Sequence, residues 1–231
     1  MTASVPADLA PWAGGPAWGR WVGRFLGRVV WDTHLIGAER VPRTGPVVLA
    51  ANHTGVIDGP LLIGMAPRPL HILVKQEMFH GPVGAVLRAA GQIPVDRANG
   101  RSALQAGLAV LRRGGAVGIF PEGNRGRGAV EDTRAGAAWL AVHGGAVVVP
   151  IAILGTRRTG ETFGHVPGLR RHLVMEAGEP IAVEPAGSRR EQIDRTSTQV
   201  RLALAALVAD LQERSGMRLP ADDPRRDTLA P

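Results

Sequence analysis

Hydrophobic and polar residues alternate in a regular way along the chain from about residue 45 onward. Short, fully apolar runs are separated by stretches in which apolar residues recur every three or four positions. The short runs are typical of strands buried on both faces, and the longer stretches are typical of helices with one buried face. We therefore expect strands at 47–51, 72–74, 93–95, 116–120, 147–154 and 173–176, and helices at 59–65, 82–90, 101–113 and 133–143.

The order of these elements predicts an α/β fold with a mixed, largely parallel sheet covered by helices. A longer amphipathic stretch at 189–214 predicts a final helix that closes the domain. We place this domain at residues 37–215. Residues 216–231 are rich in proline, aspartate and arginine, and we expect them to form a flexible tail.

Residues 1–36 differ from the rest, because they hold five of the nine aromatic residues of the chain. After a short tail, arginines recur at every fourth position, an aromatic and aliphatic arc lies opposite them, and glycines form a third stripe. This pattern predicts an amphipathic helix at a membrane interface. The side chains that we expect at the membrane surface are Trp18, Arg20, Trp21, Arg24, Phe25 and Arg28.

A second interpretation of this helix is that it packs its apolar arc on the domain and leaves its arginines in water. Gly19, Gly23 and Gly27 cost about 1 kcal/mol each in an isolated helix relative to alanine. They would instead permit close contact with another helix or with lipid. The sequence leaves both interpretations open.

Composition narrows the class of protein further. The length of 231 residues suits one domain. The absence of cysteine excludes disulfides, thiolate nucleophiles and zinc–thiolate sites. The protein therefore needs no oxidising compartment, and we take the cytosolic side as the default. The net charge of +7 indicates an anionic partner, for which nucleic acid and anionic lipid are both candidates. No apolar run approaches the roughly 20 residues needed to span a bilayer.

The segment Asn52-His53-Thr54-Gly55-Val56-Ile57-Asp58 follows the first predicted strand and offers acid–base chemistry. His53 and Asp58 would not meet on an ideal helix, but Gly55 permits a turn that could bring them together. The carboxylate would then orient the imidazole as a general base. No serine or cysteine neighbours this histidine, so the nucleophile would come from a substrate. Alternatively, Asp58 is only a helix cap and His53 a surface residue.

Two further polar segments also follow predicted strands, where ligands usually bind in such sheets. In Phe120-Pro121-Glu122-Gly123-Asn124-Arg125-Gly126-Arg127-Gly128, glycines and arginines could bind a phosphate. In Gly91-Gln92-Ile93-Pro94-Val95-Asp96-Arg97, the last two residues could form a structural ion pair, or Arg97 could point into a cleft. The segment 120–128 by itself could instead be a solvated turn.

In this order and spacing, the segments resemble the lysophosphatidate and glycerolphosphate acyltransferase family over about residues 37–185. The family blocks are Asn-His-x-x-x-x-Asp, a hydrophobic strand ending in Asp-Arg, Phe-Pro-Glu-Gly-Thr/Ser-Arg, and an apolar run centred on proline, matched here by Val148-Val149-Pro150-Ile151-Ala152. The chain departs from the pattern at Asn124, Gly126 and Pro94. These departures leave the identity of the acceptor open.

The resemblance implies a glycerolphosphate-acyltransferase-like fold in which His53 deprotonates the acceptor hydroxyl and Asp58 orients it. It also implies an acyl-CoA or acyl carrier protein donor, a lysophospholipid acceptor, and no metal or prosthetic group as cofactor. Pro150 and Ile151 would contact the acyl chain. The residues implied in acceptor binding are Lys75, Arg97, Glu122, Gly123, Asn124 and Arg125.

We therefore hypothesise acyl transfer to 1-acylglycerol-3-phosphate, which gives phosphatidic acid in phospholipid biosynthesis. The expected location is the anionic, cytoplasmic face of the cell membrane, as a peripheral (monotopic) protein with no nucleic-acid partner. Glycerol 3-phosphate or a lyso-ornithine lipid could replace this acceptor. The remaining alternatives are a non-catalytic basic module that binds anionic lipid or nucleic acid, and a hydrolytic thioesterase.

Overall fold

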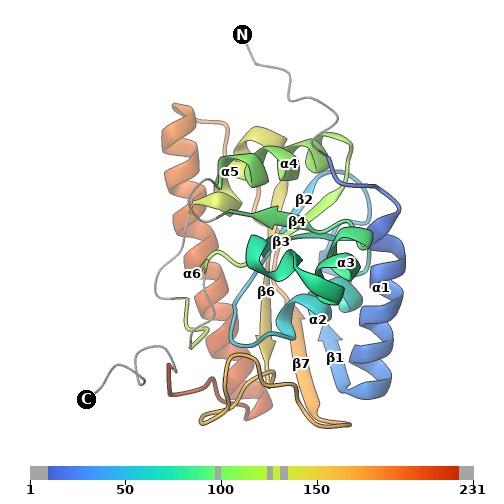
Figure 1. The fold of residues 1–231 in the computed structure, drawn as a ribbon. Coiled ribbons are helices and arrows are strands. Elements are labelled where there is room, and N and C mark those ends of the chain that lie inside the picture. The colour runs from blue at the N-terminus through green and yellow to red at the C-terminus, as the bar shows by residue number, and fades with distance from the viewer. Residues whose placement is uncertain (1–9, 97–99, 124–126, 131–134, 224–231) are drawn as a thin grey trace, which may run out of the picture.

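A seven-stranded sheet forms the centre of the molecule (Figure 1). The computed structural model describes residues 10–96, 100–123, 127–130 and 135–223. Within them, the strand order is β1-β7-β6-β2-β5-β3-β4. The strands are β1 (Asp32–Ile36), β2 (Val47–Ala51), β3 (His71–Lys75), β4 (Ile93–Val95), β5 (Ala116–Ile119), β6 (Val147–Leu154) and β7 (His172–Ala177).

Neighbouring strands of this sheet are parallel with one exception among the described residues, the antiparallel pair β6–β7. The prediction of a mixed, largely parallel sheet is therefore confirmed. The sheet nevertheless begins before the expected domain start at residue 37, because β1 pairs with β7 from Asp32 onward. Strand β1 lies at the sheet edge and carries exposed polar side chains, so it lacks the apolar run that marks the central strands.

Helices cover both faces of the sheet (Figure 1). Strand β2 shows why, since alternate side chains point to opposite faces. Val47 and Leu49 pack in one core with α2 (Asp58–Met65). Val48 and Ala50 pack in a second core with α4 (Arg101–Arg112) and α5 (Gly136–Gly144). The helices are α1 (Gly15–Phe25), α2 (Asp58–Met65), α3 (Gly81–Ala89), α4 (Arg101–Arg112), α5 (Gly136–Gly144), α6 (Arg189–Ser215), the π-helix η2 (Leu26–Val30), and the 3-10 turns η3 (Ala38–Arg40) and η4 (Gln76–Phe79).

The glycine stripe of α1 and η2 faces the protein and packs directly on α2. A β-carbon added at Gly23 would lie 2.6 Å from the carbonyl oxygen of Pro60 and 2.8 Å from the α-carbon of Gly64. Only glycine therefore allows the two backbones to approach this closely. The contact that the glycines permit is thus with another helix.

The apolar arc of the same helix points away from the protein. Trp21 is 76% exposed and Phe25 is 57% exposed, and Val22 and Val29 are about half exposed. The interpretation in which this arc packs on the domain is therefore wrong. Within the described residues, no helix has the length and apolar character needed to cross a bilayer.

Two of the six side chains expected at a membrane bond to the protein instead. The indole Nε1 of Trp18 donates to the Ala89 carbonyl at 3.0 Å, and Nε of Arg20 donates to the Ala66 carbonyl at 2.7 Å. Arg24 and Arg28 remain exposed with the apolar arc. Trp18 and Arg20 thus attach α1 to the ends of α3 and α2.

Candidate active site

The loop between β2 and α2 brings His53 and Asp58 together. Asp58 is the first residue of α2 and is fully buried. Its Oδ2 accepts hydrogen bonds from Nδ1 of His53 at 2.8 Å, from the Thr54 amide at 2.7 Å and from the Gly55 amide at 2.9 Å. Because an ionised carboxylate can only accept, Nδ1 carries the proton and Nε2 is the basic nitrogen of the neutral ring.

The Phe-Pro-Glu-Gly segment supports this histidine from the neighbouring strand. Phe120 follows β5, which pairs in parallel with β2, so both segments leave the same edge of the sheet. The Phe120 ring stacks on the imidazole with centroids 4.1 Å apart, and Oε1 of Glu122 accepts from the His53 amide at 3.0 Å. The two motifs therefore form one structural unit.

His53 lines a cavity of about 420 Å³, a volume typical of small-ligand sites. Its walls come from α2, β3, α3, α4 and the segment after β5. Most of the lining side chains are apolar. They include Pro60, Ile63, Val74, Met78, Val83, Leu87, Leu104 and Phe120.

The other residues expected in the site fall into three groups. Lys75 and Gly123 line the cavity, and Glu122 bonds to the backbone of His53. Arg97, Asn124 and Arg125 lie outside the residues that the structure describes, so their positions stay predictions. Pro150 and Ile151 form the third group.

The structure does not bring Pro150 and Ile151 to this cavity. Both are buried in the middle of β6, where Pro150 lies opposite Ala50 in the register and its carbonyl accepts from the Gly178 amide at 2.8 Å. Ile151 belongs to the core beneath α2. Their side chains therefore pack inside the protein, and neither residue lines the cavity where the sequence had suggested acyl contact.

Sequence reasoning missed the apolar walls of the cavity. Ile63, Val83 and Leu87 follow an ordinary helical periodicity, so nothing in the pattern separates a cavity wall from a core position. Their role becomes visible only in the folded chain, where these helices line the same cavity as His53.

A buried polar network supports the other side of the loop that carries His53. Thr54 and Thr156 join their hydroxyl oxygens at 2.8 Å, and the Val56 amide donates to the Phe163 carbonyl at 3.0 Å. Asn52 exchanges two hydrogen bonds with the backbone of Ile153. The loop after β6 therefore holds the His53 loop in place.

The C-terminal segment anchors this supporting loop. The fully buried guanidinium of Arg157 donates from Nη1 to Oδ1 of Asp222 at 3.0 Å and from Nη2 to the Asp222 carbonyl at 2.8 Å. The Ala221 amide donates to Oγ1 of Thr159 at 3.0 Å. The expectation of a flexible tail is therefore wrong for residues 216–223, because ordered contacts connect them to the site.

Within the described residues, one group of three side chains is spaced to hold a metal ion, and it lies on the edge strand β1 and on β7. It includes neither His53 nor Asp58 and does not line the cavity. The described part of the site thus offers a histidine–carboxylate pair beside an apolar cavity. This arrangement suits proton transfer between two bound substrates.

Comparisons with known proteins identify the family. A model of the acyltransferase family matches residues 32–154. The chain is 32% identical to 1-acyl-sn-glycerol-3-phosphate acyltransferase of Bacillus subtilis, over 62% of this chain and 70% of that protein. It is 31% identical to the lyso-ornithine lipid O-acyltransferase of Pseudomonas aeruginosa, over 84% of this chain and 80% of that protein.

The fold is also similar to a solved structure. The crystal structure of the 1-acyl-sn-glycerophosphate acyltransferase PlsC from Thermotoga maritima superposes with a TM-score of 0.64. It covers 83% of this chain and 79% of its own, at 21% sequence identity. The chain belongs to the acyltransferase family that includes the 1-acyl-sn-glycerol-3-phosphate acyltransferases, and it is an O-acyltransferase.

Proposed function

We propose that the protein transfers a fatty acyl group from acyl-CoA or acyl carrier protein to the free hydroxyl of 1-acylglycerol-3-phosphate, and so forms phosphatidic acid. The observation that carries this proposal is the 2.8 Å contact between Nδ1 of His53 and Oδ2 of Asp58 at the wall of the apolar cavity. Two relatives named above act on lysophospholipid-type acceptors according to their names. The chemistry and the relatives thus agree.

In the proposed reaction, Nε2 of His53 takes the proton of the acceptor hydroxyl as the oxygen attacks the thioester carbonyl. The new C–O bond gives a tetrahedral oxyanion, and its collapse breaks the C–S bond. The leaving thiolate then takes the proton back from the imidazolium. Asp58 stabilises this transient cation and keeps the ring in the tautomer with its proton on Nδ1.

The apolar cavity is the proposed site of the acyl chain. Its lining exposes carbon from three helices next to His53, and an alkyl chain gains roughly 0.8 kcal/mol for each methylene buried in such surroundings. This assignment replaces the one made for Pro150 and Ile151.

Cationic residues are proposed to bind the phosphate of the acceptor. Lys75 lines the cavity beside the histidine. Arg97 and Arg125 are assigned the same role from their motif positions, together with Asn124 and the backbone of Gly123. Glu122 is better placed to position the loop, since its carboxylate accepts from the His53 amide.

Attachment to the membrane is proposed through the outer surface of α1 and η2. Trp21, Phe25, Arg24 and Arg28 are exposed on it, and apolar and cationic side chains together suit an anionic bilayer interface. Helix α1 packs on α2, and α2 lines the cavity. The proposed membrane helix, on the proposed cytoplasmic face, is therefore one helix removed from the cavity that His53 lines.

An acceptor screen tests the proposal. The full chain is mixed with vesicles of phosphatidylcholine and phosphatidylglycerol, one radiolabelled acyl-CoA or acyl carrier protein, and one acceptor at a time. We expect label in phosphatidic acid with 1-acylglycerol-3-phosphate, and none with His53→Ala. Label released as free fatty acid without acceptor would instead indicate a thioesterase.

A lyso-ornithine lipid is the second candidate acceptor, because the relative of that name matches a larger share of this chain than the Bacillus subtilis enzyme does. The same screen separates the two. Faster acylation of the lyso-ornithine lipid would reject phosphatidic acid as the main product and leave the chemistry of His53 unchanged. Glycerol 3-phosphate serves as the third arm.

Vesicle sedimentation tests the membrane surface. The double variant Trp21→Ala, Phe25→Ala should bind phosphatidylglycerol vesicles at least tenfold more weakly than the unaltered chain. Leu202→Ala is the matched control, since Leu202 is similarly exposed on α6, away from α1 (Figure 1). Equal loss in both variants would contradict a specific surface.

A further inference from the structure

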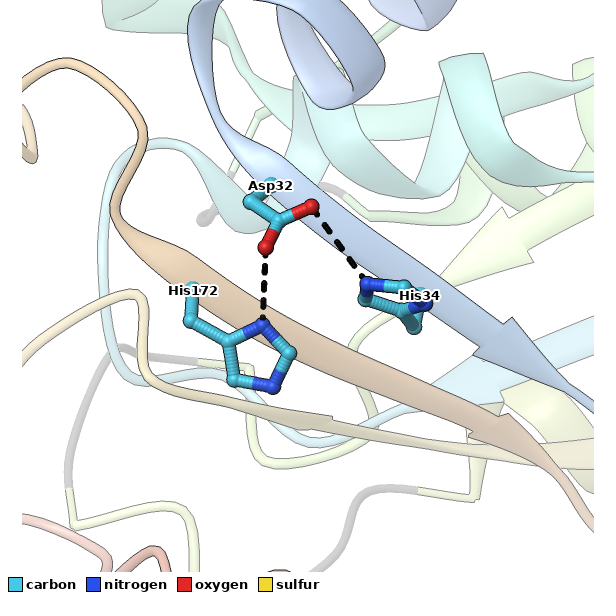
Figure 2. Close-up of side chains that lie close together, drawn as sticks. All are labelled: Asp32, His34 and His172. Carbon is cyan, nitrogen blue, oxygen red and sulfur yellow. Dashed lines mark hydrogen bonds and ion pairs between the residues drawn. The ribbon is translucent and has the colours of Figure 1, made fainter.

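Three potential metal ligands meet on strands β1 and β7 (Figure 2), and none of them lines the cavity of the proposed active site. Asp32 and His34 are two residues apart on β1, so their side chains point to the same face. His172 lies directly opposite Asp32 in the parallel pairing of β1 with β7. The strand register itself therefore brings the three together.

The spacing of the ligand atoms fits a small divalent ion. Asp32 Oδ1 lies 3.3 Å from Nε2 of His34, and Asp32 Oδ2 lies 3.3 Å from Nδ1 of His172. All three residues offer ligand atoms within 4.8 Å of one another. In a tetrahedral zinc site with bonds of about 2.0–2.1 Å, ligand atoms are about 3.3 Å apart. Each ring nitrogen lies at this separation from a different oxygen of Asp32, so an ion between the rings would be bound by both oxygens, or by one after a turn of the carboxylate.

We propose that Asp32, His34 and His172 form a binding site for a zinc-like divalent ion that ties strand β1 to strand β7. Two imidazoles and one carboxylate favour zinc, nickel or copper over magnesium or calcium, which prefer oxygen ligands. The side chains of His34 and His172 are 58% and 52% exposed. An ion can therefore enter without local unfolding, and solvent can supply the fourth ligand.

Arg170 is a positively charged side chain beside the cluster and opposes a cation there. Its Nη2 lies 3.6 Å from Oδ1 of Asp32, and its side chain is 59% exposed. The Arg170 amide donates to the Val30 carbonyl at 2.7 Å, and Nη1 donates to the Arg28 carbonyl at 3.2 Å. Both side-chain contacts are exposed, so the guanidinium could exchange them for water. The arginine should therefore weaken metal binding without blocking it.

The position of the site gives the ion a structural consequence. Strand β1 is the edge strand and directly follows Trp31 and η2, the end of the proposed membrane helix. A bound ion would join this strand to β7 through side chains in addition to the ladder. Binding should thus raise the melting temperature in proportion to the logarithm of zinc concentration above the dissociation constant.

Calorimetry with zinc chloride on the untagged full chain tests the site, with thermal unfolding as a second readout. We expect saturable one-to-one binding, and at least about tenfold weaker affinity in His34→Ala and His172→Ala. His143→Ala is the matched control, because His143 is an exposed histidine on α5 and should leave zinc affinity unchanged. Equal affinity in His34→Ala and the unaltered chain would overturn the proposal.

Two further measurements sharpen the result. Arg170→Ala should bind zinc more tightly, because a positive charge beside Asp32 is removed; weaker binding would place the ion elsewhere. Magnesium chloride at the same concentration should give no shift in melting temperature, and an equal shift would contradict an imidazole site. Neither readout depends on acyltransferase activity, so the proposed function and this site can fail independently.

Discussion

Two histidines of this protein, His53 and His71, have similar hydrogen bonds at Nδ1 but differ in the charge of their partners and in the surroundings of Nε2. Nδ1 of His53 lies 2.8 Å from Oδ2 of Asp58, and Nδ1 of His71, the first residue of β3, lies 2.6 Å from the Gly91 carbonyl oxygen. In both rings an oxygen acceptor fixes the proton on Nδ1.

The surroundings of the second nitrogen separate the two residues. Nε2 of His71 lies 2.8 Å from Nη2 of Arg113, and a guanidinium only donates, so His71 must be neutral. Burial lowers the pKa of His71 to about 4; the hydrogen bond to Gly91 partly opposes this and the Arg113 charge adds to it. His53 has instead a carboxylate partner and a place on the cavity wall.

The comparison shows that His53, unlike His71, has the two features that the proposed general base requires: a negatively charged partner and a place on a cavity wall. A carboxylate stabilises the imidazolium that forms during proton transfer. Burial and the charge of Arg113 together oppose that cation at His71 and outweigh the hydrogen bond to the Gly91 carbonyl, which favours it. The following predictions test this difference from the largest expected effect to the smallest.

Replacing each histidine by glutamine should separate catalysis from stability. His53→Gln should lower turnover by at least about 10²-fold with little change in melting temperature, because it removes a general base. His71→Gln should keep the turnover of the folded protein. Steady-state kinetics and thermal unfolding measure both, and near-normal turnover in His53→Gln would remove His53 from the mechanism.

Removing the negative charge of Asp58, the partner of His53, should lower turnover. Asp58→Asn keeps the volume and an oxygen that can accept from the Thr54 and Gly55 amides, but it no longer stabilises the imidazolium. We expect kcat to fall at least tenfold, with a smaller change in the KM of the acceptor. A change confined to KM would assign Asp58 to acceptor binding.

Weakening the Arg157–Asp222 contact, which anchors the loop behind His53, should lower stability and turnover moderately. Asp222→Asn weakens the pairing of the buried Arg157 and should cost about 1–2 kcal/mol of stability, with a several-fold fall in turnover. Glu213→Gln on the exposed side of α6 is the control. Unchanged turnover in a destabilised Asp222→Asn would show that the C-terminal segment serves the fold alone.

The pH dependence of stability should report His71. Its folded pKa of about 4 lies below the ordinary value of 6.5, so between these pH values the unfolded chain binds a proton that the folded chain does not. Unfolding free energy should therefore fall as pH falls through this window, by roughly 1 kcal/mol per pH unit. Denaturant titrations of His71→Gln should show a flatter profile, and an identical slope would contradict a neutral buried ring.

Much of the fold could be predicted because it rests on local patterns. The apolar run at Val47–Ala51 and its neighbours marked the central parallel strands, since such runs must be buried on both faces. The edge strand β1 was not recognised, because Asp32 and His34 give it a polar, exposed face. The single antiparallel pair, β6–β7, likewise depends on how the chain returns to the sheet rather than on any residue in it.

The candidate site could be predicted in part for the same reason. His53, Asp58 and Glu122 stand out because polar residues after buried strands meet at one edge of the sheet. The roles of Arg157 and Asp222 could not be predicted, since the two are far apart in sequence and look like ordinary charged residues.

The sequence by itself determined the order of the strands and main helices from residue 45 onward, the chemical groups at the strand ends and the stripe of glycines in α1. The tertiary structure alone decided which partner each group meets: Gly23 against Gly64, His53 beside an apolar cavity, and His71 against Arg113. The physical reason is the separation along the chain over which each kind of interaction acts. Periodicity and turn chemistry act over a few residues, whereas burial, partner charge and close backbone approach depend on segments that only folding brings together.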